Sequence, residues 1–306
     1  MKTKIIFSLL FLSVCLYLLS LYLHNDLSSY SVLPKKYTED SKIKILDAKV
    51  LNFSKVHELS ALAYRHDTLF ALSDQGVLYR FKLKISHNKI TKLFLKSRYP
   101  LMNNKGKKIE KRDSEGLCFY KNGFLISFER KSRVSYFSLK GKKIRKMELN
   151  EALRDQDAYV HPNKGLESVT YSKKYGIVTA PELPLKKHNQ KYHTLYAHSK
   201  IWKFQADGAI TDLTFMNKTK IIVLLRQFSY LTRRKITSLV EVNLQNCNEQ
   251  RVCQSQLLIR MDSDNGWKID NFEGLTKVGK DRYLMVSDDN DSIFQKTLLV
   301  LFEIKS

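Results

Sequence analysis

The sequence is poor in cysteine, glycine and proline. Its 306 residues include only 4 Cys, 11 Gly and 5 Pro. So few cysteines exclude a small domain built around disulfides, and so little glycine and proline exclude a collagen-like or low-complexity chain. Acidic residues are also scarce, since 30 Asp and Glu stand against 53 Lys and Arg and leave a formal net charge of +23. Hydrophobic residues make up 43%, so the chain is neither disordered nor a polytopic membrane protein.

One long apolar run occurs, from Ile5 to Leu23, and it contains no charged residue. A helix of that length spans about 30 Å of hydrocarbon. Lys2 and Lys4 precede the run, which predicts that residues after about position 26 lie across the membrane. Because no small-residue cleavage site ends the run, an uncleaved signal anchor is favoured over a cleaved signal peptide or a lipoprotein signal. Residues 1–26 are therefore expected to export the protein, anchored in the inner membrane and facing the periplasm, or secreted if cleaved.

Export bears on the cysteines and on the positive charge. Cys247 and Cys253 lie in a polar stretch that is expected to join two strands, and an oxidising compartment favours a disulfide between them. An exported protein seldom meets chromosomal DNA. The charge therefore predicts contact with anionic lipid or envelope polymers, and not with nucleic acid.

The rest of the chain divides into two parts by composition. Residues 27–45 are polar, lack a sustained period and are expected to form a stalk. Residues 46–306 contain short apolar runs separated by turn-forming residues about every 8–12 positions, which is typical of an all-β domain.

A repeated unit runs through this all-β domain. Each copy is an acidic residue, a strand, a tight turn, a second strand and another charged residue 14 to 16 positions after the first. The leading residues are Glu58, Glu115, Glu167, Asp212 and Glu273, separated by 57, 52, 45 and 61 positions. In an antiparallel hairpin the two charged residues lie side by side. One hairpin per repeat at this spacing predicts a β-propeller of five or six blades, whose first strands line the axis.

The propeller would gather these charged residues at one mouth of its channel. The pairs are Glu58/Asp74, Glu115/Glu129, Glu167/Glu182, the charge-reversed Asp212/Arg226, and Glu273/Asp288 with Asp289 and Asp291. Converging carboxylates repel one another unless a cation compensates them, and hard oxygen ligands without Cys or His favour calcium. The expected calcium ligands are Glu58, Asp74, Glu115, Glu129, Glu167, Glu182, Glu273, Asp288 and Asp289. The structural alternative is that each acid clamps the next blade or pairs with Arg130, Lys164 or Arg226.

The same segments resemble the phytase-like family, also described as the "esterase-like activity of phytase" domain of exported bacterial proteins. The most specific matches are Asn163-Lys-Gly-Leu-Glu167, Asn271-Phe-Glu-Gly-Leu275 and Val286-Ser-Asp-Asp-Asn290, and the resemblance covers about residues 45–306. It implies hydrolysis of a phosphoester or ester. Two positions depart from the family: Leu225 stands where a Glu tends to precede Arg226, and Ser168 replaces the Gly after Glu167. Leu225 thus removes one carboxylate from the expected ring.

A phosphoester hydrolase of this kind would combine calcium with basic side chains. We expect Glu167, Glu182, Arg226 and Lys164 to be catalytic, and Arg130, Lys164, Arg226 and Asn290 to bind the phosphorylated or ester substrate. A serine esterase is disfavoured because no GxSxG motif occurs. The rival hypothesis is a non-catalytic, membrane-tethered propeller that binds a ligand or partner at the same mouth, since the fold alone does not decide function.

Overall fold

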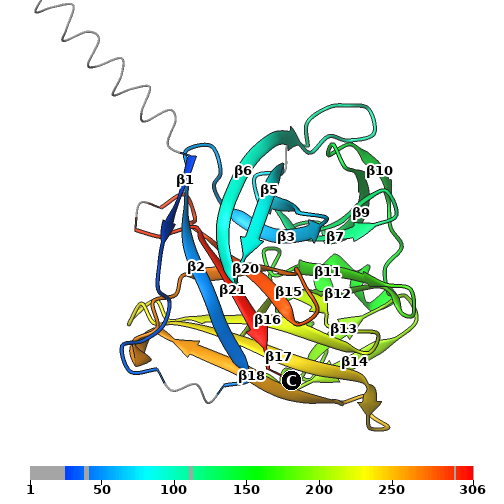
Figure 1. The fold of residues 1–306 in the computed structure, drawn as a ribbon. Coiled ribbons are helices and arrows are strands. Elements are labelled where there is room, and N and C mark those ends of the chain that lie inside the picture. Colours follow the sequence, from blue (N-terminus) through cyan, green and yellow to red (C-terminus); the bar gives the residue numbers. More distant parts are fainter. Residues whose placement is uncertain (1–24, 38–40, 110–112, 293, 306) are drawn as a thin grey trace, which may run out of the picture.

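The computed structural model describes residues 25–37, 41–109, 113–292 and 294–305. Within this range the strands form five antiparallel sheets, arranged around a central axis as the blades of a β-propeller (Figure 1). The prediction of an all-β propeller is confirmed, and the described chain forms five blades and not six.

The strands of each blade are given from the axis outward. Blade 1 contains β3 (Leu59–Arg65), β4 (Thr68–Ser73), β5 (Val77–Ser86) and β6 (Lys89–Pro100). Blade 2 contains β7 (Ser114–Tyr120), β8 (Gly123–Phe128), β9 (Arg133–Ser138) and β10 (Lys143–Lys146). Blade 3 contains β11 (Leu166–Ser172), β12 (Gly176–Pro181), β13 (His193–Tyr196) and β14 (Ile201–Phe204). Blade 4 contains β15 (Ala209–Phe215), β16 (Lys220–Phe228), β17 (Lys235–Cys247) and β18 (Cys253–Asp262).

Blade 5 joins the two ends of the described chain and so closes the ring. Its inner strands are β19 (Asn271–Lys277), β20 (Arg282–Asp288) and β21 (Leu298–Ile304), and its outer strands are β2 (Ile43–Phe53) and β1 (Asn25–Ser29). The short 3-10 helices η1 (Glu151–Leu153), η2 (Gln156–Ala158) and η3 (Ser263–Asn265) lie in loops between strands. Strand β2 pairs antiparallel with β21 from Ile43 to Val50. Because this pairing links early and late residues, the propeller is complete only when both parts of the chain are present.

The segment expected as a polar stalk differs in the structure. It contributes β1 to blade 5, and Val32 is fully buried in the core between blades 4 and 5. The prediction failed because β1 is an edge strand held by backbone pairing with β2, which requires no apolar alternation in its side chains.

Each inner hairpin carries a β-bulge at the same place. The register shifts at Ser60 in blade 1, at Glu115 and Gly116 in blade 2, at Glu167 in blade 3, at Thr211 in blade 4 and at Glu273 in blade 5. A bulge bends the strand and redirects the side chain of the extra residue. The repeat therefore positions one side chain per blade at the same level of the channel.

The glycine of the Glu-Gly-Leu motif allows neighbouring inner strands to approach. A Cβ atom on Gly274 would lie 2.9 Å from the Cα atom of Ala61 in blade 1. On Gly116 it would lie 2.6 Å from the backbone nitrogen of Val169 in blade 3. Distances this short leave no room for a side chain. The motif thus serves the packing of the blades as well as the placement of the acid.

Hydrophobic side chains pack between each pair of neighbouring blades. Five buried clusters fill the five interfaces, and the largest buried side chains include Phe124, Phe204, Phe272 and Phe302. Within the described residues, no helix is long and apolar enough to cross a membrane. The apolar run from Ile5 to Leu23 lies outside them.

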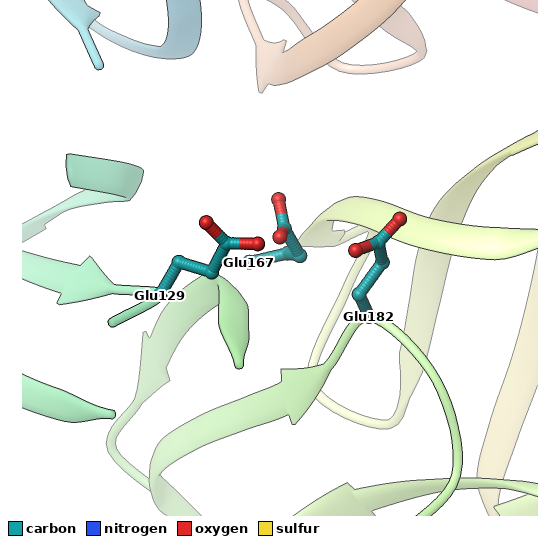
Figure 2. Close-up of side chains that lie close together, drawn as sticks. All are labelled: Glu129, Glu167 and Glu182. Carbon is teal, nitrogen blue, oxygen red and sulfur yellow. The ribbon is translucent and has the colours of Figure 1, made fainter. Parts of the chain in front are cut away.

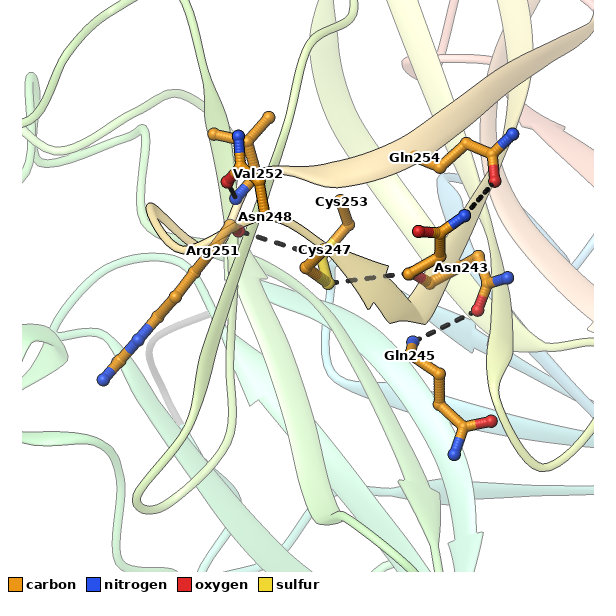
Figure 3. Close-up of a disulfide and its surroundings, with 9 residues drawn as sticks. Asn243, Gln245, Cys247, Asn248, Arg251, Val252, Cys253 and Gln254 are labelled. Carbon is orange, nitrogen blue, oxygen red and sulfur yellow. Dashed lines mark hydrogen bonds between the residues drawn. A yellow bond between two sulfur atoms is a disulfide. The ribbon is translucent and has the colours of Figure 1, made fainter.

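The two cysteines of the polar stretch form a disulfide, as the sequence predicted. Cys247 and Cys253 close the tip of the hairpin formed by β17 and β18, with an S–S distance of 2.09 Å (Figure 3). The enclosed loop contacts blade 3, because the backbone N–H of Lys203 donates to the carbonyl oxygen of Arg251 at 2.8 Å. The disulfide therefore restrains the loop of blade 4 that contacts blade 3.

Candidate functional site

Two positions of each inner hairpin lie at one end of the channel, which we call the acidic mouth. The bulged positions are Ser60, Glu115, Glu167, Thr211 and Glu273. The positions at or beside the end of the next strand are Asp74, Glu129, Glu182, Arg226 and Asp288. The carboxylates interact electrostatically across blades. Besides burial, the pKa of Glu115 is raised by four neighbouring carboxylates, those of Glu273, Glu129, Asp74 and Asp288. The repeat thus brings these acids together, as the sequence predicted.

In blades 4 and 1 the leading acid, Asp212 or Glu58, does not occupy the bulged position. Asp212 is opposite Leu224, whereas Arg226 is opposite Ala209, so the predicted pair Asp212/Arg226 is wrong. The bulge at Thr211 shifts the register and leaves the Asp212 carboxylate buried, where it accepts hydrogen bonds from the backbone N–H groups of Leu213 and Leu275. Asp212 therefore clamps blade 4 to blade 5.

In blade 1, the bulged position holds Ser60, and Glu58 lies two residues earlier, at the entrance to β3. The backbone N–H of Glu58 donates to Oδ1 of Asp289 at 3.0 Å, and the hydroxyl of Thr297 donates to Oδ2 of Asp289 at 2.6 Å. Asp289 therefore holds blade 5 against blade 1, and Glu58 lies beside it. Both acids remain predicted calcium ligands at the edge of the acidic mouth.

Three carboxylates at the acidic mouth lie close enough to share one cation. Carboxylate oxygens of Glu129, Glu167 and Glu182 all lie within 4.8 Å of one another. Figure 2 shows the three side chains converging from the turn after β8, from β11 and from the loop after β12. Glu167 and Glu182 are only 7% and 3% exposed. We call this set the three-glutamate cluster.

Burial and mutual repulsion raise the pKa values of Glu129 and Glu167. Burial, with repulsion from Glu182, raises the pKa of Glu129 to about 7, although Lys164 opposes the shift. Burial, followed by the charges of Glu115 and Glu182, holds the pKa of Glu167 well above its usual range. Carboxylates in this state lack compensating positive charge. A cation at the three-glutamate cluster would relieve the repulsion.

A second group of acids lies across the mouth, on blades 2 and 5. Burial, followed by repulsion from Glu273, raises the pKa of Asp288 to about 9. Burial also raises the pKa of Glu273, against the attraction of Arg226. For Glu115, burial and the neighbouring carboxylates of Glu273 and Glu129 raise the pKa well above the usual range.

Two basic side chains reach the acids of the mouth. The Nζ atom of Lys164 lies 2.8 and 2.7 Å from Oε1 and Oε2 of Glu182. The guanidinium of Arg226 donates to Oε1 of Glu273 at 2.7 Å and lies 3.7 Å from Glu182. Burial disfavours the charge on Arg226, but the surrounding carboxylates, led by Glu273, raise its pKa. The structural alternative, in which bases pair with the acids, therefore holds for these two residues.

The remaining predicted substrate-binding residues lie further out. Arg130 is exposed and contacts Asn163 at 2.8 Å and Asp113 at 3.4 Å. Asn290 follows β20, where its backbone N–H donates to Asp288 at 2.8 Å. Both residues lie at the edge of the acidic mouth, so their roles as substrate ligands remain predictions.

A cleft of about 750 Å³ opens beside the acidic mouth. We call it the mouth cleft; it is lined by Lys164, Glu182, Leu183, Gly208, Ala209, Arg226, Gln227, Phe228, Tyr230, Arg233, Lys235, Ile236, Thr237, Asp270, Asn271, Asn290 and Gln295. Four of the predicted site residues border it: Lys164, Glu182, Arg226 and Asn290. A molecule in this cleft would therefore contact both bases and the edge of the three-glutamate cluster.

Asn271 is a site residue to which the sequence assigned no role. Its side-chain amide donates to Glu273 at 2.7 Å, and its oxygen accepts from Arg226 at 2.5 Å. It stands two residues before Glu273, just as Asp113 stands two residues before Glu115. This recurrence of a polar residue two positions before the acid is the sequence feature that could have identified Asn271.

The donor set fits calcium. The three-glutamate cluster supplies only carboxylate oxygens, which are hard ligands of the kind that calcium prefers. The cluster is also mostly buried and lacks enough positive charge to balance its acids. The residues that would hold the ion are Glu129, Glu167 and Glu182.

Comparisons with known proteins identify a family. The family model described as "Phytase-like: Esterase-like activity of phytase" matches residues 54–291, and no curated protein matches the chain. Among solved structures, the chain is similar to a glutaminyl cyclase from Myxococcus xanthus, with 10% identity, a TM-score of 0.49 and coverage of 86% of this chain and 97% of that one. It is also similar to a chain of the mitotic checkpoint complex, with 8% identity and a TM-score of 0.39, covering 81% of this chain but only 62% of that one. At these scores the likenesses carry no argument about function.

Proposed function

The chain belongs to the phytase-like family, and from that premise we propose that its acidic mouth hydrolyses a phosphoester or ester with the assistance of calcium. The observation that carries the proposal is the three-glutamate cluster, in which buried carboxylates converge within 4.8 Å next to two basic side chains. Bound calcium would supply positive charge against the oxygens of a phosphoryl group.

The basic residues would bind the substrate. Lys164 and Arg226 border both the mouth cleft and Glu182, so a phosphate entering the cleft meets two cations that already face it. Arginine binds phosphate oxygens in a bidentate manner, and lysine acts as a point charge. Arg130 and Asn290, at the edge of the mouth, would contact the rest of the substrate.

The three acids of the cluster would hold the cation. Burial raises the pKa of Glu129 to about 7 in the ion-free protein, and a bound cation would keep its carboxylate deprotonated. Glu182 is the member of the cluster that contacts both bases, so it would keep Lys164 and Arg226 oriented toward the cleft. Glu167 is contacted by neither base and would serve mainly to hold the cation.

Export remains part of the proposal. The apolar run from Ile5 to Leu23 would carry the propeller across the inner membrane, either as an anchor or as a cleaved signal. The Cys247–Cys253 disulfide supports an oxidising compartment such as the periplasm.

The test is an assay of the purified full-length chain against three substrate classes: a phosphomonoester, a phosphodiester and a carboxyl ester. Each is measured in calcium and in a chelator. We expect at least one phosphoester to be hydrolysed in calcium and not in the chelator. Inactivity against all three classes would contradict the proposal and favour a propeller that binds a ligand or partner without catalysis. Equal rates in calcium and chelator would contradict the role of the metal.

A further inference from the structure

Three large apolar side chains are almost fully exposed to solvent. Tyr230, Leu231 and Phe294 are 84%, 97% and 86% exposed, whereas every other large hydrophobic residue of the described chain is at most 54% exposed. We call these three residues the apolar rim. Soluble proteins rarely expose large apolar side chains together, and such groups mark surfaces that contact a partner or a membrane.

All three residues lie on loops of the same face as the acidic mouth. Tyr230 and Leu231 follow β16, which carries Arg226 two residues before its end. Phe294 follows β20, which ends at Asp288. Tyr230 and Gln295, the neighbour of Phe294, both line the mouth cleft. The apolar rim therefore borders the entrance to the candidate site.

The described chain also begins on this face. In blade 5, Asn25 pairs with Phe53, at the end of β2, and the backbone N–H of Leu51 donates to Thr297 beside the start of β21. Strand β21 starts at the mouth, since Thr297 contacts Asp289. Figure 1 shows the start of β1 on the same side of the propeller as the loops after β16 and β20, at the left of the view. Position 25 lies two residues after the apolar run that ends at Leu23.

A cationic side chain accompanies the rim. Arg233 is exposed, lines the mouth cleft and has no ion-pair partner among the residues that the structure describes. An arginine beside exposed aromatic and aliphatic groups suits the boundary between anionic headgroups and acyl chains. A soluble protein partner would require a recessed or shaped complementary surface, whereas a bilayer accepts single protruding side chains.

We propose that the mouth face lies on an anionic lipid bilayer, with Tyr230, Leu231 and Phe294 inserted at its surface. The mouth cleft then opens toward the lipid, and its substrate is an amphiphile whose phosphorylated or ester headgroup enters from the bilayer. The proposal of an amphiphilic substrate rests on the proposed hydrolysis, whereas the proposed orientation of the propeller at the bilayer does not. In the sequence, only residue 24 separates the apolar run from β1, so an anchor formed by that run would keep the mouth near the membrane.

The orientation can be tested with the full-length chain in vesicles of phosphatidylcholine and phosphatidylglycerol. Tryptophan is introduced by Leu231→Trp and, as a matched control, by Leu257→Trp on β18, a residue that is 54% exposed and away from the mouth loops. Lipids brominated in the acyl chains quench tryptophan only where it enters the bilayer. After subtraction of the wild-type signal from Trp202 and Trp267, we expect at least twofold quenching at position 231 and none at 257. Equal signals at the two positions would overturn the proposed orientation.

The amphiphilic substrate is tested by a separate assay. The variant L231S/F294S should hydrolyse phosphatidic acid in vesicles at least tenfold more slowly than the wild type, while both hydrolyse soluble p-nitrophenyl phosphate at the same rate. Neither residue lines the mouth cleft. Equal rates of the two proteins on both substrates, or a wild type that cleaves only the soluble ester, would overturn the amphiphilic substrate. A wild type inactive on both would exclude phosphomonoester hydrolysis from the proposed function, and the quenching result would still decide the orientation.

Discussion

Replacing Glu129 by glutamine should make the calcium-free protein more stable at alkaline pH. Burial and repulsion raise the pKa of Glu129 from 4.5 to about 7, so the folded state binds this proton more tightly than the unfolded state does. Stability is therefore lost as the pH rises from the unfolded pKa to the folded one. A shift of this size costs about 3 kcal/mol at pH 8 and less than about 1 kcal/mol at pH 5.

Glutamine keeps the shape of Glu129 and removes the charge. In a chelator at pH 8, E129Q should raise the free energy of unfolding by up to about 3 kcal/mol, or the melting temperature by roughly 6 °C. At pH 5, the two proteins should differ by no more than about 1 kcal/mol. Calcium should reverse the order at pH 8, because only the wild type keeps all three carboxylates and gains the full stabilisation by binding.

The assay is thermal unfolding of the wild type, E129Q and a control, E249Q, whose glutamate is exposed on the disulfide loop. The control should match the wild type in every condition. An E129Q variant that unfolds at the same or a lower temperature than the wild type, in chelator at pH 8, would refute the reasoning from repulsion. Equal stabilisation of both proteins by calcium would remove Glu129 from the binding site.

Three further predictions concern the framework of the site. Gly274→Ala should lower the free energy of unfolding in urea by about 1–3 kcal/mol, because the new methyl group meets the backbone of blade 1 at 2.9 Å. The control Gly279→Ala, with 3.3 Å to its nearest neighbour, should have less effect, and equal losses would refute the close approach. Replacing Cys247 and Cys253 by serine should cost about 2 kcal/mol of unfolding free energy, as expected for a short closed loop, and an unchanged urea midpoint would show that the loop needs no restraint. Arg226→Met should lower the melting temperature in chelator at pH 8, since it removes the cation beside the buried carboxylate of Glu273 at a cost of about 3 kcal/mol. A higher melting temperature would contradict the ion pair at 2.7 Å.

The hairpin repeat predicted the architecture because the spacing of its charged residues follows from the geometry of a β-hairpin. The charged residues 14 to 16 positions apart, such as Glu167 and Glu182, flank a hairpin and must meet at its open end. The same reasoning placed Lys164 and Arg226 at the same mouth as the acids, and the structure shows that both contact Glu182. It could not find blade closure by β1 and β2, because that pairing joins distant parts of the chain through the backbone.

The errors arose at the bulges. A single extra residue reverses the side to which a strand residue points, and the sequence carries no mark of it. Asp212 therefore pointed to the neighbouring blade, although its spacing to Arg226 matched the repeat. The apolar rim was missed for another reason: Leu231 and Phe294 are isolated in polar loops, and only the arrangement of the loops shows that they flank one cleft.

The central claim is that calcium at the three-glutamate cluster supports hydrolysis of a phosphoester. The most direct measurement is the hydrolysis rate of p-nitrophenyl phosphate as free calcium is returned to the chelated protein, for the wild type and for Glu167→Gln. We predict that the rate of the wild type rises and saturates with calcium, and that the rate of E167Q stays at least a hundredfold lower at the same concentrations. A wild-type rate that does not depend on calcium, or an E167Q variant as active as the wild type, would contradict the claim.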